Sequence, residues 1–220
     1  GRFCATTEVP HQAARRFGWP CARHRGLDVS GAQRRHREPQ PVPQIWNQGG
    51  RVGGHHATEG SGVTEWQGKR YWIVGASEGL GAALCHKMSR AGVELILSAR
   101  SEDRLTELAG ELPGKSEVVT VDVSDMDSVT AAVDAIGDID GVVFLAGVYW
   151  PMKASEWNAE QANLMADVNF TGAMRVMGAI VPKFVEKDHG HIVLTGSLSG
   201  FRGLPGAIGY SASKAGVMAL

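Results

Sequence analysis

From Lys69 onward, short apolar runs alternate with segments of helical periodicity, and this alternation strongly constrains the fold. Each run is rich in Val, Ile and Leu and ends at turn residues, as expected for strands that are buried on both faces. Five strands are predicted, at residues 70–74, 93–98, 117–121, 141–146 and 191–195.

The segments between these strands are predicted to be helices. They cover residues 80–91, 102–112, 126–136 and 155–186, and a last helix begins near residue 208. The long stretch contains Pro182, whose missing N–H predicts a kink or a late break there. Strands that alternate with helices predict an α/β fold, a Rossmann-like doubly wound parallel sheet in a single domain.

Residues 1–62 differ in composition from the rest of the chain. They carry nine Arg, no Lys and four acidic residues, with few Val, Ile, Leu or Phe. This apolar content is too small to offset chain entropy, so the segment is predicted to be disordered. Arg without Lys, mixed with Gly, Pro, His and Gln, is typical of translated GC-rich non-coding DNA. We therefore expect non-native translation here, a natural start near Val63, and a domain at residues 63–220.

Two functional alternatives for residues 1–62 are weaker. Arg34, Arg35 and Arg37 could belong to a nucleic-acid-binding arm, but the cluster is short and has no aromatic or helical pattern. A zinc site is not expected, because no pair has ligand spacing among Cys4, Cys21, His11 and His24. We expect neither a nucleic-acid partner nor a metal.

Composition excludes several other classes of protein. The formal net charge is −1, and the three Cys are too few and too widely spaced for a disulfide scaffold. The first residues lack the apolar core of a secretory signal. No apolar run approaches the roughly 20 residues that span a bilayer. These features predict a cytoplasmic protein without a membrane partner.

A glycine-rich loop, GASEGLG, joins the first predicted strand to the first predicted helix. Glycines allow a tight turn and a close backbone approach to a pyrophosphate, and the helix N-terminus offers unpaired N–H groups. The alternative is a tight turn without a ligand. The position at the first strand–helix junction favours phosphate binding by Gly75, Ser77, Glu78, Gly79, Leu80 and Gly81.

Tyr210 and Lys214 are four residues apart and therefore lie on one face of the last predicted helix. A nearby ammonium favours a phenolate, which would let Tyr210 act as a general acid and base. Ser197 ends the fifth predicted strand, where a doubly wound sheet places its active residues. A chance Tyr/Lys pair beside a turn serine is the alternative when these residues are taken alone.

From about Lys69 to its last residue the chain resembles the short-chain dehydrogenase/reductase family. The resemblance rests on several motifs that occur together in the family's order. They are GxxxGxG at 75–81, Asp122, Ala146-Gly147, Asn169, Ser197 and Tyr210-Ser-Ala-Ser-Lys214.

The resemblance implies a role for each catalytic position. Tyr210 would exchange a proton with the substrate oxygen, and Lys214 would assist it and bind the nicotinamide ribose. Ser197 would polarise a carbonyl or alcohol substrate. Asn169 would hold a water that links Lys214 to solvent, and its alternative is local hydrogen bonding within a helix.

The resemblance also implies a nicotinamide cofactor. Asp122 would accept a hydrogen bond from the adenine amino group, unless it only caps the next helix. Further contacts are expected from Val123, Ala146 and Gly147. The end of the second strand has no acid and carries Arg100, which favours NADP(H) over NAD(H), the alternative. Glu78 opposes this choice, since many NADP-using relatives have a basic residue there; Arg100 could also simply pair with Glu102 or Asp103.

Two features depart from the family pattern. The usual Asn-Asn before Ala-Gly is Phe144-Leu145, which places local stability or cofactor affinity in doubt. Family members continue past the Tyr/Lys helix with two more strands and a substrate-covering loop, and they form homodimers or homotetramers. We therefore expect these 220 residues to be a poorly stable, inactive fragment of an active enzyme.

Two other functions remain open on the same fold. A sensor or regulator could bind the nucleotide without consuming it, although it would not need the catalytic residues. Isomerase or dehydratase chemistry usually accompanies a GxxGxxG loop, and Glu78 occupies the position where that pattern needs glycine.

Overall fold

Five parallel strands form one sheet in the computed structural model, which describes residues 66–220. The strand order is β3-β2-β1-β4-β5. The strands are β1 (Arg70–Val74), β2 (Glu94–Ser98), β3 (Ser116–Val118), β4 (Gly141–Phe144) and β5 (His191–Leu194). The chain moves outward from β1 to β3 and then returns to the other side of β1. This order confirms the predicted doubly wound sheet and places a crevice between β1 and β4.

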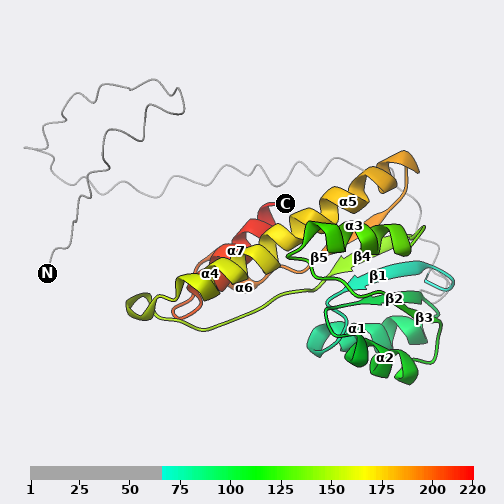
Figure 1. Cartoon of the computed structure of the whole chain (residues 1–220), viewed down its shortest axis with the longest axis horizontal. Helices are drawn as coiled ribbons and strands as arrows, with labels where there is room; N and C mark the ends of the chain where they lie inside the picture. The colour runs from blue at the N-terminus through cyan, green and yellow to red at the C-terminus, as the bar shows by residue number, and fades with distance from the viewer. Residues whose placement is uncertain (1–65) are drawn as a thin grey trace, which may run out of the picture. The chain divides into compact units, whose positions relative to one another are not determined.

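Helices cover both faces of the sheet (Figure 1). α1 (Gly79–Arg90) and α2 (Glu102–Glu111) pack on one face, and α3 (Met126–Ala135) and α5 (Gly172–Glu186) pack on the other. α7 (Ile208–Ala219) lies beside α4 (Ala159–Ala166) and the short α6 (Leu198–Phe201). The predicted sequence of strands and helices is thus confirmed, with α6 as an addition.

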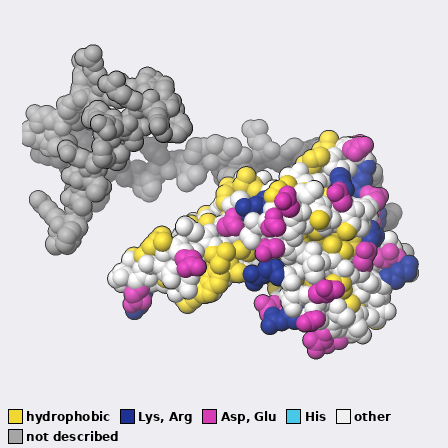
Figure 2. Space-filling model, in the orientation of Figure 1, with side chains coloured by type: hydrophobic (Ala, Val, Ile, Leu, Met, Phe, Trp, Pro, Cys, Tyr) yellow, Lys and Arg dark blue, Asp and Glu magenta, His cyan; other side chains and the backbone are white. Residues whose placement is uncertain are grey.

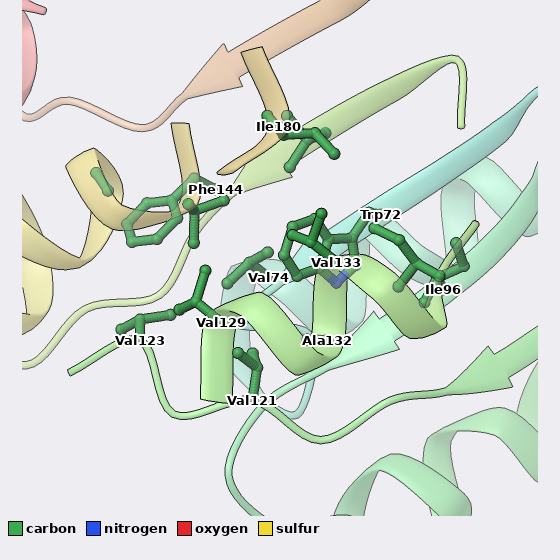
Figure 3. Close-up of a cluster of buried hydrophobic side chains, with 14 of the residues drawn as sticks. Trp72, Val74, Ile96, Val121, Val123, Val129, Ala132, Val133, Phe144 and Ile180 are labelled. Atoms are coloured by element: carbon green, nitrogen blue, oxygen red, sulfur yellow. The ribbon is translucent and has the colours of Figure 1, made fainter. Parts of the chain in front are cut away.

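Two buried clusters explain why the strand sequences are continuously apolar. On one face Trp72 and Val74 of β1 pack with Phe144 of β4, Val133 of α3 and Ile180 of α5 (Figure 3). Successive residues of a strand point to opposite faces. Accordingly Tyr71 and Ile73 belong to the other cluster, together with Cys85 of α1 and Leu105 of α2.

The long predicted helix at residues 155–186 begins later than predicted and changes helix type within its length, away from Pro182. The segment begins with a 3-10 turn at Ala154–Glu156, and Asn158 then caps α4 by accepting a hydrogen bond from the Gln161 N–H at 3.0 Å. Between α4 and α5 the backbone forms one π-helical segment at Asp167–Thr171. This local change of helix type brings Asn169 into the interior.

Pro182 does not break the helix, which continues to Glu186. Its missing N–H leaves the carbonyl of Gly178 without a helical donor. Gly178 is exposed, so water can take the place of that donor. Of the predicted kink or late break at Pro182, the break is therefore wrong.

The continuous stretch from α4 to α5 is also longer than the apolar runs considered from the sequence. The stretch is 28 residues long and contains an 18-residue window with a mean hydropathy of 1.2, so it is long and apolar enough to cross a membrane by length and composition alone. Its buried residues Val176, Ile180 and Phe184 pack in the core, as in an interior helix.

Several predicted boundaries differ by a few residues. β3 ends at Val118 rather than at residue 121, yet the N–H groups of Val119 and Val121 still donate to the carbonyls of Leu97 and Ala99 at 3.0 Å. The chain thus follows β2 beyond the regular strand. The predictions for residues 1–62, including disorder, the start near Val63, the arginine cluster and the absence of zinc, lie outside the described residues.

Candidate active site

A cavity of about 440 Å³ opens at the carboxyl ends of the strands. Its position beside β1 and β4 is the crevice where doubly wound sheets bind ligands, and its volume suits a small molecule. Twelve of the predicted site residues line it: Gly75, Ser77, Glu78, Leu80, Gly81, Arg100, Asp122, Val123, Ala146, Gly147, Tyr210 and Lys214. Three predicted residues lie outside the lining, namely Gly79, Asn169 and Ser197.

The glycine loop is tightly enclosed by backbone. Gly75 has φ +94°, and a Cβ atom there would lie 2.5 Å from the Ala146 nitrogen. A Cβ at Gly81 would collide with the Gly75 carbonyl oxygen. Within the described part of the chain, the Glu78 side chain makes no capping hydrogen bond to α1, so the first N–H groups of this helix stay available. The loop therefore suits a phosphate group at the helix N-terminus.

Asp122 also lines the cavity. Its Oδ1 accepts hydrogen bonds from the Ser124 hydroxyl at 2.6 Å and the Ser124 N–H at 2.9 Å. These bonds, helped by the charge of Arg100, hold the pKa of Asp122 below its usual value. The cap of α3 is Asp125, which accepts from the Asp127 N–H at 3.0 Å. The alternative role of Asp122 as that helix cap is therefore wrong.

Two arginines and a glutamate line the cavity beside the end of β2. Arg100 is exposed, and among residues 66–220 it forms no ion pair with Glu102 or Asp103. Arg104, in the first turn of α2, instead pairs with Glu78 at 2.8 Å. Arg104 was not predicted as a site residue, although it lies in the first turn of the predicted helix that follows Arg100.

Tyr210 and Lys214 stand on one face of α7, as predicted, and both line the cavity. Lys214 is buried, and its Nζ donates a hydrogen bond to the Thr195 carbonyl at 2.8 Å. Nζ lies 5.8 Å from the centroid of the Tyr210 ring. Burial lowers the pKa of Lys214 from its usual 10.5. The site thus places an ammonium group beside a phenol in a partly desolvated setting.

Tyr149 is a lining residue that the sequence did not assign to the site. Its ring meets the ring of Tyr210 edge-on, with centroids 5.0 Å apart, and the side chain remains half-exposed. Edge-to-face packing of this kind restricts the orientation of the Tyr210 ring.

Asn169 is fully buried next to the cavity. Its Oδ1 accepts from the Val148 N–H at 2.7 Å, while its Nδ2 donates to the Val148 carbonyl and the Ser213 hydroxyl, both at 3.0 Å. Ser213 in turn donates to the Tyr210 carbonyl at 2.8 Å. The amide therefore ties the loop after β4 to the helix of Tyr210 and Lys214. Its predicted role in a water relay stays a prediction.

Ser197 caps α6 rather than facing the cavity. Its Oγ accepts from the Ser199 N–H at 3.2 Å and lies 2.9 Å from the Ser199 Oγ. The two residues that replace the family's asparagines are well packed. Phe144 belongs to the buried core, and Leu145 lines the cavity.

Comparison with known proteins agrees with this arrangement. Residues 69–220 match the family model described as short chain dehydrogenase. An uncharacterized oxidoreductase of Staphylococcus epidermidis is 36% identical over 152 residues, covering 67% of this chain and 66% of that protein. One of Myxococcus xanthus is 37% identical over 150 residues, covering 65% of this chain and 59% of that protein. The chain thus spans just under two thirds of the length of these curated relatives.

Solved structures show the same likeness. A short chain dehydrogenase from Mycobacterium smegmatis superposes with a TM-score of 0.68 at 28% identity, covering 74% of this chain and 70% of that one. One from Bacillus anthracis gives a TM-score of 0.66 at 25% identity, covering 69% and 66%. The match to the family model extends over most of the chain and includes every element of the sheet. The chain belongs to the short-chain dehydrogenase family.

Proposed function

We propose that this protein is an oxidoreductase that interconverts a carbonyl and an alcohol with NADP(H), using Tyr210 as the general acid and base. The observation that carries the proposal is a shared cavity. The phosphate-binding glycine loop and the Tyr210–Lys214 pair line the same space at the carboxyl end of the sheet. A nucleotide held by the loop would therefore extend toward a proton-carrying side chain.

The residues fit a dinucleotide in three places. Gly75, Gly81 and the open N-terminus of α1 would hold the pyrophosphate. Asp122 would accept from the adenine amino group. Gly147 leaves room near Lys214, since a Cβ there would lie 3.8 Å from Nζ and 3.2 Å from the Asn169 Oδ1.

When bound, the nicotinamide group supplies or accepts the hydride. The Tyr210 hydroxyl donates its proton to the carbonyl oxygen in reduction and takes it back from the alcohol in oxidation. The Lys214 ammonium stabilises the phenolate, and the Thr195 carbonyl fixes its position. The Ser197 hydroxyl would hold the substrate oxygen once it gives up its contact with the Ser199 hydroxyl.

The choice of NADP(H) over NAD(H) is supported by charge. No acid lies at the end of β2 in Ser98-Ala99-Arg100, where a carboxylate would bind a ribose 2′-hydroxyl. Arg100 is exposed and lines the cavity, so its guanidinium is available to a 2′-phosphate. Arg104 adds a second guanidinium to the lining of the cavity.

A homodimer or homotetramer of the full-length protein is part of the proposal. Hydrophobic side chains gather over the part of the surface formed by α4 and α7 (Figure 2). Leu164 of α4 and Met218 of α7 are among the exposed large hydrophobic side chains of these two helices. Light scattering of the longest available chain would measure the assembly, and a monomer would contradict this part.

A sensor that binds the nucleotide without consuming it is the second candidate. It is favoured by one observation, the engagement of Ser197 with Ser199 outside the cavity lining. A sensor would quench or shift nicotinamide fluorescence but would turn over none of a panel of aldehydes and ketones.

The decisive experiment combines binding and turnover on the full-length protein, in the longest form that contains these residues. We expect NADPH to bind with a change in its fluorescence, and a carbonyl panel to contain a substrate that consumes it. Tyr210→Phe should keep NADPH binding and reduce turnover by about 10²- to 10⁴-fold. Tyr71→Phe is the matched control, because Tyr71 lies outside the cavity and bonds to His191. Equal turnover by the Tyr210→Phe and Tyr71→Phe variants would refute the assignment of Tyr210.

A further inference from the structure

The Glu78–Arg104 ion pair joins the glycine loop to the start of α2 at the side of the cavity. Arg104 Nη1 lies 2.8 Å from Glu78 Oε2, and both residues line the cavity together with Arg100. The two side chains are 60% and 77% exposed, respectively. The ion pair therefore lies at the solvent-exposed edge of the cavity rather than in the interior of the protein.

An exposed ion pair is held only weakly, because water screens the attraction and both side chains lose freedom. Arg104 can therefore exchange its carboxylate partner at small cost. A phosphate group carries more charge than a carboxylate and offers the paired oxygens that a guanidinium binds well.

We propose that Glu78 and the 2′-phosphate of the nucleotide compete for Arg104, so that this ion pair sets how strongly the site prefers NADPH over NADH. When NADH binds, Arg104 keeps its ion pair with Glu78, so no ion pair is broken. With NADPH, Arg104 moves to the phosphate beside Arg100, and the Glu78 carboxylate is left unpaired. The inference rests on the proposed function, since it concerns the same nucleotide.

This competition also accounts for Glu78 itself. Its acidity argues against NADP(H) when the sequence is considered alone. In the structure the carboxylate is neutralised by Arg104, so it moderates the preference instead of reversing it. The consequence is a site that accepts both nucleotides and binds NADPH more tightly.

Fluorescence titration of the whole chain with NADPH and with NADH tests the proposal without any substrate. The variants are Glu78→Gln, Arg104→Gln and the double variant. Arg104→Gln should weaken NADPH binding about 10-fold, because a charge-assisted hydrogen bond is lost, and should change NADH binding less than about 2-fold. Glu78→Gln should tighten NADPH binding about 3- to 10-fold and leave NADH unchanged.

The double variant isolates the competition. In the Arg104→Gln background, Glu78→Gln should change NADPH binding less than about 2-fold, because the contested partner is gone. Binding of 2′-AMP should respond to the variants as NADPH does, and binding of 5′-AMP should respond as NADH does. This result would place the effect at the 2′-phosphate. Glu94→Gln and Lys115→Gln are matched controls, since this exposed pair at 2.9 Å lies away from the cavity lining.

Each outcome separates the inference from the proposed function. If the unsubstituted chain binds neither nucleotide, the proposed function is wrong and the inference falls with it. If it binds both and Arg104→Gln weakens them equally, only the inference is overturned. The same holds if Glu78→Gln tightens NADPH binding equally with and without Arg104, because direct repulsion would then explain the effect.

Discussion

The side-chain amide of Asn169 closes on both backbone groups of Val148, accepting from its N–H at 2.7 Å and donating to its carbonyl at 3.0 Å. The two residues are 21 positions apart in the chain. Asn169 lies within the π-helical segment and is fully shielded from solvent. A backbone segment that would otherwise be unpaired next to the cavity is thus fixed by one side chain.

Replacing Asn169 with Leu should leave the N–H and carbonyl of Val148 without their partner. Each unsatisfied group costs about 1–3 kcal/mol, so we expect the free energy of unfolding to fall by about 2–6 kcal/mol. Asn163→Leu on exposed α4 is the control, with an expected change within about 0.5 kcal/mol. Urea unfolding of both variants measures the difference, and equal stabilities would contradict the importance of this contact.

Gly75→Ala should destabilise the protein and abolish nucleotide binding. At φ +94° a side chain is strained, and its Cβ would lie 2.5 Å from the Ala146 nitrogen, so we expect a loss of about 3 kcal/mol or more. Gly110→Ala is the matched control. Gly110 lies in α2 without a positive φ, and a Cβ added there would meet nothing within 4 Å. That variant should gain about 0.5 kcal/mol. Thermal unfolding and NADPH titration distinguish the two, and a harmless Gly75→Ala would refute this account of the loop.

Cys85 should make the protein less stable at alkaline pH. Burial raises the pKa of its thiol from 9.0 to about 12 in the folded protein. Between these values the unfolded chain has lost the thiol proton while the folded chain keeps it, so stability falls as the pH rises. From pH 7.5 to pH 10 the unsubstituted protein should lose about 1 kcal/mol more than Cys85→Ala. Urea midpoints at several pH values test this, and parallel pH dependence of the two proteins would disprove it.

Local features of the sequence were sufficient to predict most of the fold. Apolar runs such as residues 141–144 must be buried on both faces, and parallel strands need covering helices. The glycine loop, Arg100 and the Tyr210–Lys214 spacing depend on neighbours in sequence, and the structure brings them to one cavity as predicted. The nicotinamide role of this cavity and the catalytic roles of its residues remain predictions.

Features that depend on distant contacts escaped prediction. Pro182 suggested a break, but the exposed carbonyl of Gly178 allows the helix to continue. The partner of Glu78 is Arg104, 26 residues away, and no local pattern announces such a pair. Ser197 was expected at the cavity, yet its hydroxyl caps α6, a helix too short to produce a periodic signal.

By itself, the sequence determined the order of strands and helices, the position of the phosphate loop and the helical face that carries Tyr210 and Lys214. These follow from continuous apolar runs, from the helical periodicity of 3.6 residues and from glycines at turns, which act over a few positions. Only the tertiary structure decided where Asn169 directs its amide, which charge Glu78 meets and where the long helix changes type. Such choices depend on burial and on partners that chain folding alone brings within hydrogen-bonding distance, and no local sequence pattern encodes them.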